Sequence, residues 1–147
     1  MRVVVAVVAG ESPPAAAEGF LLSMRLSCRG VRVVNLGAGM TLEEAVAQLG
    51  RHRGVQALLL VCAEGGAAVE RRLHDLPRLR ADGAVTCPVF AGGVGAGVRR
   101  DLRRMAPALR RLGVAQVLND LADTAYLLPA VSANPAASAC LVPGGPA

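Results

Sequence analysis

Short apolar runs alternate along this chain with longer stretches whose apolar residues recur at helical spacing. The apolar runs cover residues 3–9, 31–36, 55–62, 88–91 and 114–118. The stretches with helical spacing cover residues 15–28, 41–49, a segment from 67, 98–112 and 121–131. Continuous runs rich in Val and Leu are typical of parallel strands that are buried on both faces. The pattern therefore predicts five strands, each followed by a helix.

Local signals set several of the expected boundaries. Thr41 and Glu44 form a capping box, which predicts that a helix starts there. Pro77 should kink the third helix or end it before Arg80, because proline lacks the backbone N–H that a helix interior needs. Pro107 should kink the fourth helix or begin a second segment for the same reason.

Five consecutive strand–helix units predict a flavodoxin-like (Rossmann-like) α/β fold, a three-layer sandwich. Its five-stranded parallel sheet is expected to have the strand order 2-1-3-4-5. The chain of 147 residues is long enough for one such domain, which we expect to span residues 1–131. Residues 132–147 are rich in Ala, Pro and Gly without periodicity, and we expect a flexible tail there.

Composition argues for a folded protein outside the membrane. Hydrophobic residues make up 53% of the chain and charged residues 18%, so disorder is not expected. No apolar run reaches the roughly 18–20 residues of a membrane helix. The run at 3–9 is too short for a signal peptide and is followed by Glu11 and two prolines. We therefore expect a cytoplasmic protein.

The formal net charge of +5 raises the question of a nucleic-acid partner. Every basic residue is arginine, and many arginines occur in pairs on predicted helix faces, as at 71–72 and 103–104. Such pairs are more typical of a solvated surface than of a binding site. Aromatic residues make up only 2% of the chain, which argues against base stacking. We expect neither a nucleic-acid nor a membrane partner.

Ligands in open parallel sheets bind outside the carboxyl ends of the strands, at the switch point between the first and third strands. This rule places the candidate site at Glu11 and Ser12 after the first strand and at Asn119 after the fifth. The remaining candidates follow the third and fourth strands: Cys62, Ala63, Glu64, Gly65, Gly92 and Gly93.

The candidate residues have more than one interpretation each. Residues 92–97 are glycine-rich, which either brings a backbone close to a bulky ligand or serves only as a turn. Glu11 and Glu64 could perform acid/base chemistry or hold a cation, but two solvated loop residues are the favoured interpretation. His52 and His74 are predicted to lie away from this edge, and the four cysteines lack metal-site spacing, so no metal site and no catalytic residue are expected.

Taken in order, these residues resemble a known family. The segments 33–37 with 41–45, 90–93, and 112–118 are similar to corresponding parts of cobalamin-binding domains. The likeness is greatest to the stand-alone small subunit of glutamate (methylaspartate) mutase and covers about residues 1–130. It implies cobalamin, as adenosylcobalamin, across the carboxyl ends of the strands, with its nucleotide tail inserted between the sheet and a helix. It also implies a larger catalytic barrel subunit, which carries out the isomerisation.

The resemblance is incomplete where the family binds cobalt. Residues 12–17 stand where the family has Asp-x-His-x-x-Gly, so Pro14 falls on the position of the histidine that ligates cobalt. Shifting the alignment by one or two residues does not restore the histidine or its carboxylate partner. Residues 61–63 stand where the family has Ser-x-Leu, so the hydroxyl is lost.

Three hypotheses follow. The chain could be a mutase-type subunit that holds cobalamin with water, Cys62 or nothing beneath the cobalt. It could instead be a degenerate relative that binds no cobalamin and serves a larger enzyme as a structural or regulatory partner. It could also bind another small ligand through Glu11 and Glu64. An open channel below Gly92 would favour the first hypothesis, and a channel filled by Phe20 or Met24 the second.

Overall fold

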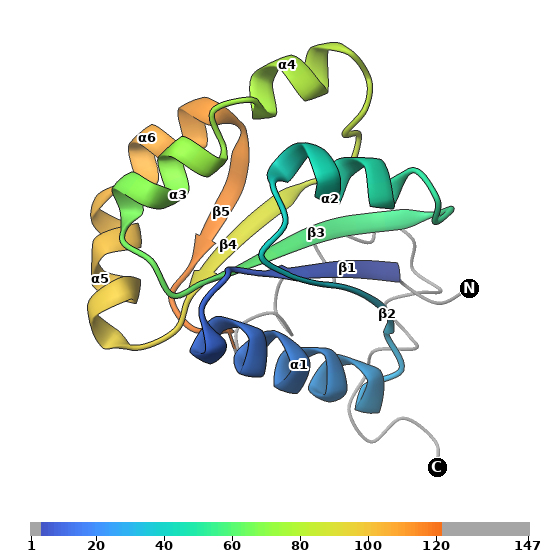
Figure 1. The fold of residues 1–147 in the computed structure, drawn as a ribbon, viewed down its shortest axis with the longest axis horizontal. Helices are drawn as coiled ribbons and strands as arrows, with labels where there is room; N and C mark the ends of the chain where they lie inside the picture. The colour runs from blue at the N-terminus through green and yellow to red at the C-terminus, as the bar shows by residue number, and fades with distance from the viewer. Residues whose placement is uncertain (1–3, 122–147) are drawn as a thin grey trace.

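The computed structural model describes residues 4–121 and places eleven elements in that range, shown in Figure 1. The strands are β1 (Val4–Ala9), β2 (Arg32–Ala38), β3 (Val55–Cys62), β4 (Val89–Gly93) and β5 (Val114–Leu118). The helices are α1 (Pro13–Cys28), α2 (Leu42–Leu49), α3 (Gly66–Arg72), α4 (Leu76–Ala81), α5 (Ala96–Arg104) and α6 (Ala106–Leu112).

The strands form one sheet in the order β2-β1-β3-β4-β5, and every neighbouring pair is parallel. The predicted α/β fold and strand order are therefore confirmed. All carboxyl ends lie on one edge of the sheet, and β1 and β3 lie side by side at its centre. The chain crosses from β1 outward to β2 and then back to β3. The switch point therefore lies between the carboxyl ends of β1 and β3.

Two apolar clusters cover the two faces of the sheet. One cluster joins alternate residues of β1, β3, β4 and β5 to α2 through α6, and includes Leu58, Leu76 and Leu102. The other joins the intervening residues to α1, and includes Val61 and Leu22. Figure 1 shows α2 through α6 on one face of the described part and α1 on the other. The period of two along each buried strand produces this division.

Helix α1 begins two residues earlier than the sequence pattern predicts. Pro13 and Pro14 occupy its first turn, and the side chain of Ser12 caps it by accepting a hydrogen bond from Ala15 N at 3.4 Å. Proline is tolerated there because the first N–H groups of a helix have no partner within the helix. The two prolines therefore extend the helix into the segment that the sequence analysis treated as a loop.

Other boundaries differ for similar local reasons. The third helical segment divides into α3 and α4, and Pro77 lies in the first turn of α4 rather than at a kink. The segment around Pro107 divides at Met105, so the expected second segment is confirmed as α6. Strand β4 includes Gly92 and Gly93, which were expected to end it. Strands β3 and β5 have the predicted bounds.

Beyond Leu121, the predicted helix at 121–131 and the predicted tail at 132–147 lie outside the described residues. Within residues 4–121, no helix has the length and apolar character needed to cross a membrane.

Candidate functional site

Backbone hydrogen bonds join the loops to the strand ends at the carboxyl edge. Gly10 N donates to Val61 O at 2.8 Å, and Val94 N donates to Cys62 O at 2.7 Å. On the other side of β1, Gly39 N donates to Ala9 O at 3.3 Å. These bonds satisfy carbonyl groups that would otherwise face the site, and they fix the path of each loop without using a side chain.

A polar cavity of about 470 Å³ opens at this edge on the side of α2 and α3. Its lining includes Glu11, Thr41, Glu64, Arg71, Arg72 and Asp75. Glu11 and Glu64 thus lie on one rim, as predicted from their places after β1 and β3. Glu11 is exposed and Glu64 is half-buried, so both carboxylates remain in contact with solvent.

Arg72, at the end of α3, contacts two loops at this cavity. Its guanidinium donates to Met40 O at 3.3 Å, in the turn between β2 and α2. A Cβ atom added at Gly10 would lie 3.5 Å from Arg72 Nη1, so the arginine also packs against the end of β1. Arg72 therefore braces the cavity wall with part of its hydrogen-bonding capacity and leaves further N–H donors for other groups.

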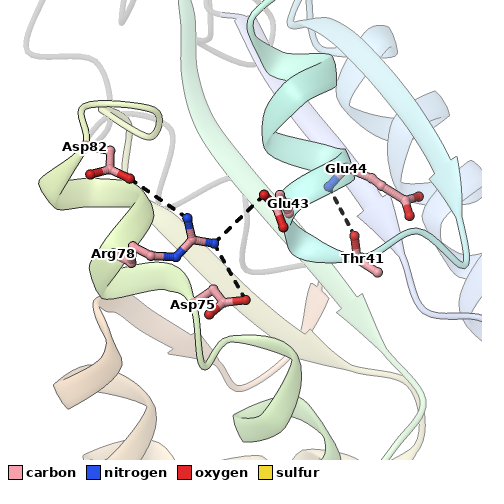
Figure 2. A network of polar contacts seen from close by, with 6 residues as sticks. All are labelled: Thr41, Glu43, Glu44, Asp75, Arg78 and Asp82. Carbon is pink, nitrogen blue, oxygen red and sulfur yellow. Dashed lines mark hydrogen bonds and ion pairs between the residues drawn. The ribbon is translucent and has the colours of Figure 1, made fainter.

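Figure 2 shows a network of charged residues beside the cavity. Arg78 on α4 lies 3.9 Å from a carboxylate oxygen of each of Glu43, Asp75 and Asp82. Thr41 caps α2 by accepting a hydrogen bond from Glu44 N at 3.1 Å, as the capping box predicts. The side chains of the network are at least half exposed, so each ion pair contributes little to stability. Together the three carboxylates balance the positive charge of Arg78.

Cys62 is buried and does not line the polar cavity. Its side chain is 1% exposed and belongs to the cluster between the sheet and α2 through α6. Burial raises the pKa of this thiol to about 12, despite the opposing effect of Arg72. The void beside it measures about 10 Å³ and has room for about one water. The thiol therefore stays protonated at neutral pH, which argues against Cys62 as a nucleophile.

Gly92 and Gly93 are packed closely by the protein itself. A Cβ atom at Gly92 would lie 2.5 Å from Leu121 Cδ2 and 3.4 Å from Leu118 Cδ1. A Cβ atom at Gly93 would lie 3.0 Å from the backbone nitrogen of Arg99 on α5. The absence of side chains at these positions thus allows close packing of a leucine on one face and of a helix on the other.

Gly65 has a similar explanation. Together with Gly66 it begins α3, and a Cβ atom on Gly65 would lie 2.8 Å from Asp101 Oδ2. The same carboxylate accepts a hydrogen bond from Gly66 N and pairs with Arg104 at 2.5 Å. These two interactions lower the pKa of Asp101, with the Gly66 bond as the larger cause. The glycine pair therefore joins α3 to α5.

The remaining predicted site residues have local roles or none that the structure displays. Ser12 is half-buried and caps α1. Ala63 packs partly against the α1-side cluster. Asn119 is exposed just after β5. His52 and His74 are exposed, and no cluster of His, Cys, Asp or Glu within residues 4–121 could hold a metal ion.

Sequence reasoning missed Arg72, Asp101 and Leu121. Arg72 and Asp101 act across 32 and 35 residues of sequence, and no local spacing reports such contacts. Leu121 was placed at the start of a predicted helix, and its approach to Gly92 depends on how the chain turns after β5.

No protein-family model matches the chain, and no curated protein matches its sequence. Solved structures resemble it in fold, among them two cobalamin-binding or corrinoid proteins. A novel cobalamin-binding protein from Desulfitobacterium hafniense DCB-2 has a TM-score of 0.68 and 14% identity, over 89% of this chain. The monomethylamine corrinoid protein of Methanosarcina barkeri has a TM-score of 0.64 and 18% identity, over 88% of this chain. The chain has the fold of these cobalamin-binding proteins. It spans 60% and 57% of their respective lengths.

We tested whether the residues present fit the corrinoid that the resemblance implies. Pro14, on which the resemblance places the cobalt-ligating histidine, lies in the first turn of α1. The space beside Gly92, which the family uses for the nucleotide tail, contains Leu121 and Leu118. Phe20 and Met24, which would have filled the channel under the second hypothesis, are 59% and 50% exposed, so that sign of a closed channel is absent. The described conformation therefore does not fit a histidine-ligated cobalamin with its tail inserted.

Proposed function

We propose that this chain is a non-catalytic, cobalamin-binding-like small subunit, which works with a larger catalytic barrel chain of the glutamate-mutase type. In this role it is a structural or regulatory partner, and it neither ligates cobalt nor holds the nucleotide tail. The fold and the strand order support its relation to cobalamin-binding proteins. The residues at the carboxyl edge support the loss of cofactor binding.

One observation carries this proposal. A Cβ atom at Gly92 would lie 2.5 Å from Leu121 Cδ2, and Leu121 itself is only 5% exposed. Apolar side chains packed this closely leave no room for a nucleotide base directly beside Gly92. The cavity of about 430 Å³ on the α1 side is lined instead by Leu121 and the second half of α1. Pro14 has no side-chain ligand atom and Cys62 is 1% exposed, which supports the same conclusion.

A second candidate function is a carrier of adenosylcobalamin without a protein ligand to the cobalt. The likeness to two cobalamin-binding proteins favours it, as does the retained Gly92-Gly93 turn. This function requires Leu121 to leave the space beside Gly92. The cofactor would then supply radical chemistry to the partner, and this chain would contribute its edge loops and the exposed face of the cavity.

The first experiment incubates the purified full chain with hydroxocobalamin and, separately, with adenosylcobalamin, removes free cofactor by desalting, and records the visible spectrum. We expect a colourless protein. A chain that retains about one equivalent of corrinoid would establish the carrier function in place of the first proposal. The band positions would then report whether the base is off the cobalt.

The Leu121→Ala variant sharpens this experiment, because it empties the space beside Gly92 without touching the sheet. Retention by Leu121→Ala but not by the wild type would identify Leu121 as the obstacle. The partner role is tested separately by co-purification with the large mutase-like chain of the same source. Loss of that chain during purification at physiological salt would contradict the partner role.

A further inference from the structure

The excess positive charge of this protein is confined to one part of the fold. Residues 96–112, which form α5 and α6, contain six arginines and one aspartate, a net charge of +5. The whole chain also has a net charge of +5, with 16 arginines against 11 acidic residues. The rest of the chain is therefore neutral, with as many acidic residues as arginines. A composition rich in arginine does not by itself produce this localisation.

Most of these arginines are exposed and unpaired. Arg100, Arg103, Arg110 and Arg111 are exposed, and none of them forms an ion pair within residues 4–121. Arg104 pairs with Asp101, the single acidic residue of the two helices. We call the four unpaired residues the α5–α6 basic surface.

The neighbouring helix α4 provides the contrast. There, Arg78 is surrounded by three carboxylates, as Figure 2 shows. Three members of the α5–α6 basic surface lie in the last turns of their helices, where the helix dipole favours cations. The dipole accounts for a cation at each terminus, but it places no carboxylate near the outward-facing guanidinium groups.

Both helices turn these charges toward solvent. Leu102 and Leu109 are fully buried and fix which side of α5 and of α6 faces the sheet. The four arginines are exposed, so they lie on the sides of the two helices that face solvent. Figure 1 shows α5 and α6 following one another along the outside of the helical layer. Like charges held together on rigid helices attract an oppositely charged surface and orient it.

We propose that the α5–α6 basic surface docks a carboxylate-rich surface of a partner protein. The proposal rests on the partner role given above and adds the surface through which the two chains would meet. A guanidinium group binds a carboxylate through two parallel N–H···O bonds, which gives direction as well as charge to the contact. Four such groups on two rigid helices form a pattern that a partner can match.

Duplex nucleic acid fits this surface less well. A helix that reads DNA must enter the major groove, but α5 packs against α3 through Asp101 and against the end of β4 through Arg99. Residues 96–112 contain no aromatic residue for stacking on bases. They also expose no large apolar side chain that would insert into a lipid surface. An acidic protein surface is the partner that remains.

The test measures binding of a fluorescent polyglutamate peptide to the full chain by anisotropy, at low and at physiological salt. The Arg103→Glu/Arg110→Glu double variant reverses two charges of the basic surface. We expect its affinity to fall about tenfold or more. The matched control is Arg51→Glu/Arg53→Glu, which makes the same charge change at two exposed residues in the turn after α2. We expect the control to lose less than about twofold.

Three results would overturn the proposal. Equal losses in the two double variants would mean that the peptide senses net charge only. Binding of a short DNA duplex, or of vesicles containing phosphatidylserine, as tightly as the peptide would assign the surface to nucleic acid or membrane instead. Failure of the wild type to bind the peptide at low salt would remove the docking surface altogether. Thermal melting of each variant checks that it is folded.

Co-purification with the large mutase-like chain separates this proposal from the proposed function. If the wild type does not retain that chain, the partner role fails, whatever the peptide experiment shows. If the wild type retains it and Arg103→Glu/Arg110→Glu retains it equally well, the partner role stands and the docking surface is wrong.

Discussion

The two sides of the carboxyl edge differ, although the same strands supply both. On the side of α1, leucines 118 and 121 fill the space beside Gly92. On the side of α2 and α3, a polar cavity of about 470 Å³ is open between Glu11, Glu64 and Arg72. Topology alone places the candidate ligand site at this edge. Side-chain packing determines where space remains: on the α1 side a cavity of about 430 Å³ lies along the second half of α1 and Leu121, away from Gly92.

This difference bears on how fold likeness is used. The solved cobalamin-binding proteins share the sheet order of this chain at 14% and 18% identity. A shared sheet preserves the edge, but a single leucine can close the side on which a cofactor tail would lie. The glycines at 92 and 93 therefore do not by themselves indicate a ligand, since packing within the chain also requires them.

The largest expected effect comes from emptying the closed side. Leu118 is 2% exposed, and Leu118→Ala should lower the free energy of unfolding by about 2–5 kcal/mol, because it removes buried methyl groups and leaves a cavity. Urea unfolding measures the loss. Met24→Ala on the exposed face of α1 is the control and should change little. Similar losses in the two variants would mean that the side is not closely packed.

The next effect tests the contact between α3 and α5 that supports the open side. In Gly66→Ala the new Cβ would lie 2.9 Å from Met105 Cβ and nearer still to its Cγ. We expect a loss of about 1–3 kcal/mol from overpacking. Gly97→Ala, with nothing within 4 Å, should instead stabilise the protein by about 0.4–1 kcal/mol. A neutral result for Gly66→Ala would show that α3 and α5 are further apart than described.

A smaller effect is expected at the cavity wall. Arg72→Ala removes the hydrogen bond to Met40 O and should cost about 0.5–1.5 kcal/mol. Urea unfolding again gives the value, and Arg71→Ala, an exposed neighbour without that bond, is the matched control. If Arg71→Ala costs as much, Arg72 does not brace the loops.

The smallest effect depends on pH. The pKa of Asp101 lies below its ordinary value of 3.8 because Gly66 N and Arg104 favour the ionised carboxyl group. Its stabilising contribution is therefore complete above the ordinary pKa and disappears as the pH falls through the lowered value. Asp101→Asn should be less stable than the wild type at neutral pH, and the difference should shrink in acid. A difference that stays constant down to strongly acid pH would contradict the assigned cause.

The sequence predicted those features that depend on period and order. The buried runs at 55–62 and 114–118 become strands with the expected bounds, because a short continuous apolar run between turn residues favours a buried strand. The order of the sheet followed from the alternation of strands and helices. The position of Glu11 and Glu64 on one rim followed from the same topology.

The hydrophobic pattern of the sequence did not predict other features. The start of α1 at Pro13 reflects the cap at Ser12, which is a choice between a loop and a first helical turn of nearly equal energy. The closure beside Gly92 depends on Leu121, whose path after β5 has no periodic signal. The bracing by Arg72 joins α3 to the turn before α2. The last two are tertiary contacts between segments distant in sequence.

The backbone bonds that join the loops to the strand ends have a consequence for how such a protein can change over generations. Gly10, Gly39 and Val94 hold their loops through main-chain nitrogens, so these contacts do not depend on a side chain. Substitutions of loop side chains that neither cap a helix nor pack against a neighbour leave these contacts intact, and selection can exchange or discard a ligand set while the architecture persists. This separation makes the fold evolvable, and it explains how the architecture remains recognisable where sequence comparison finds no relative.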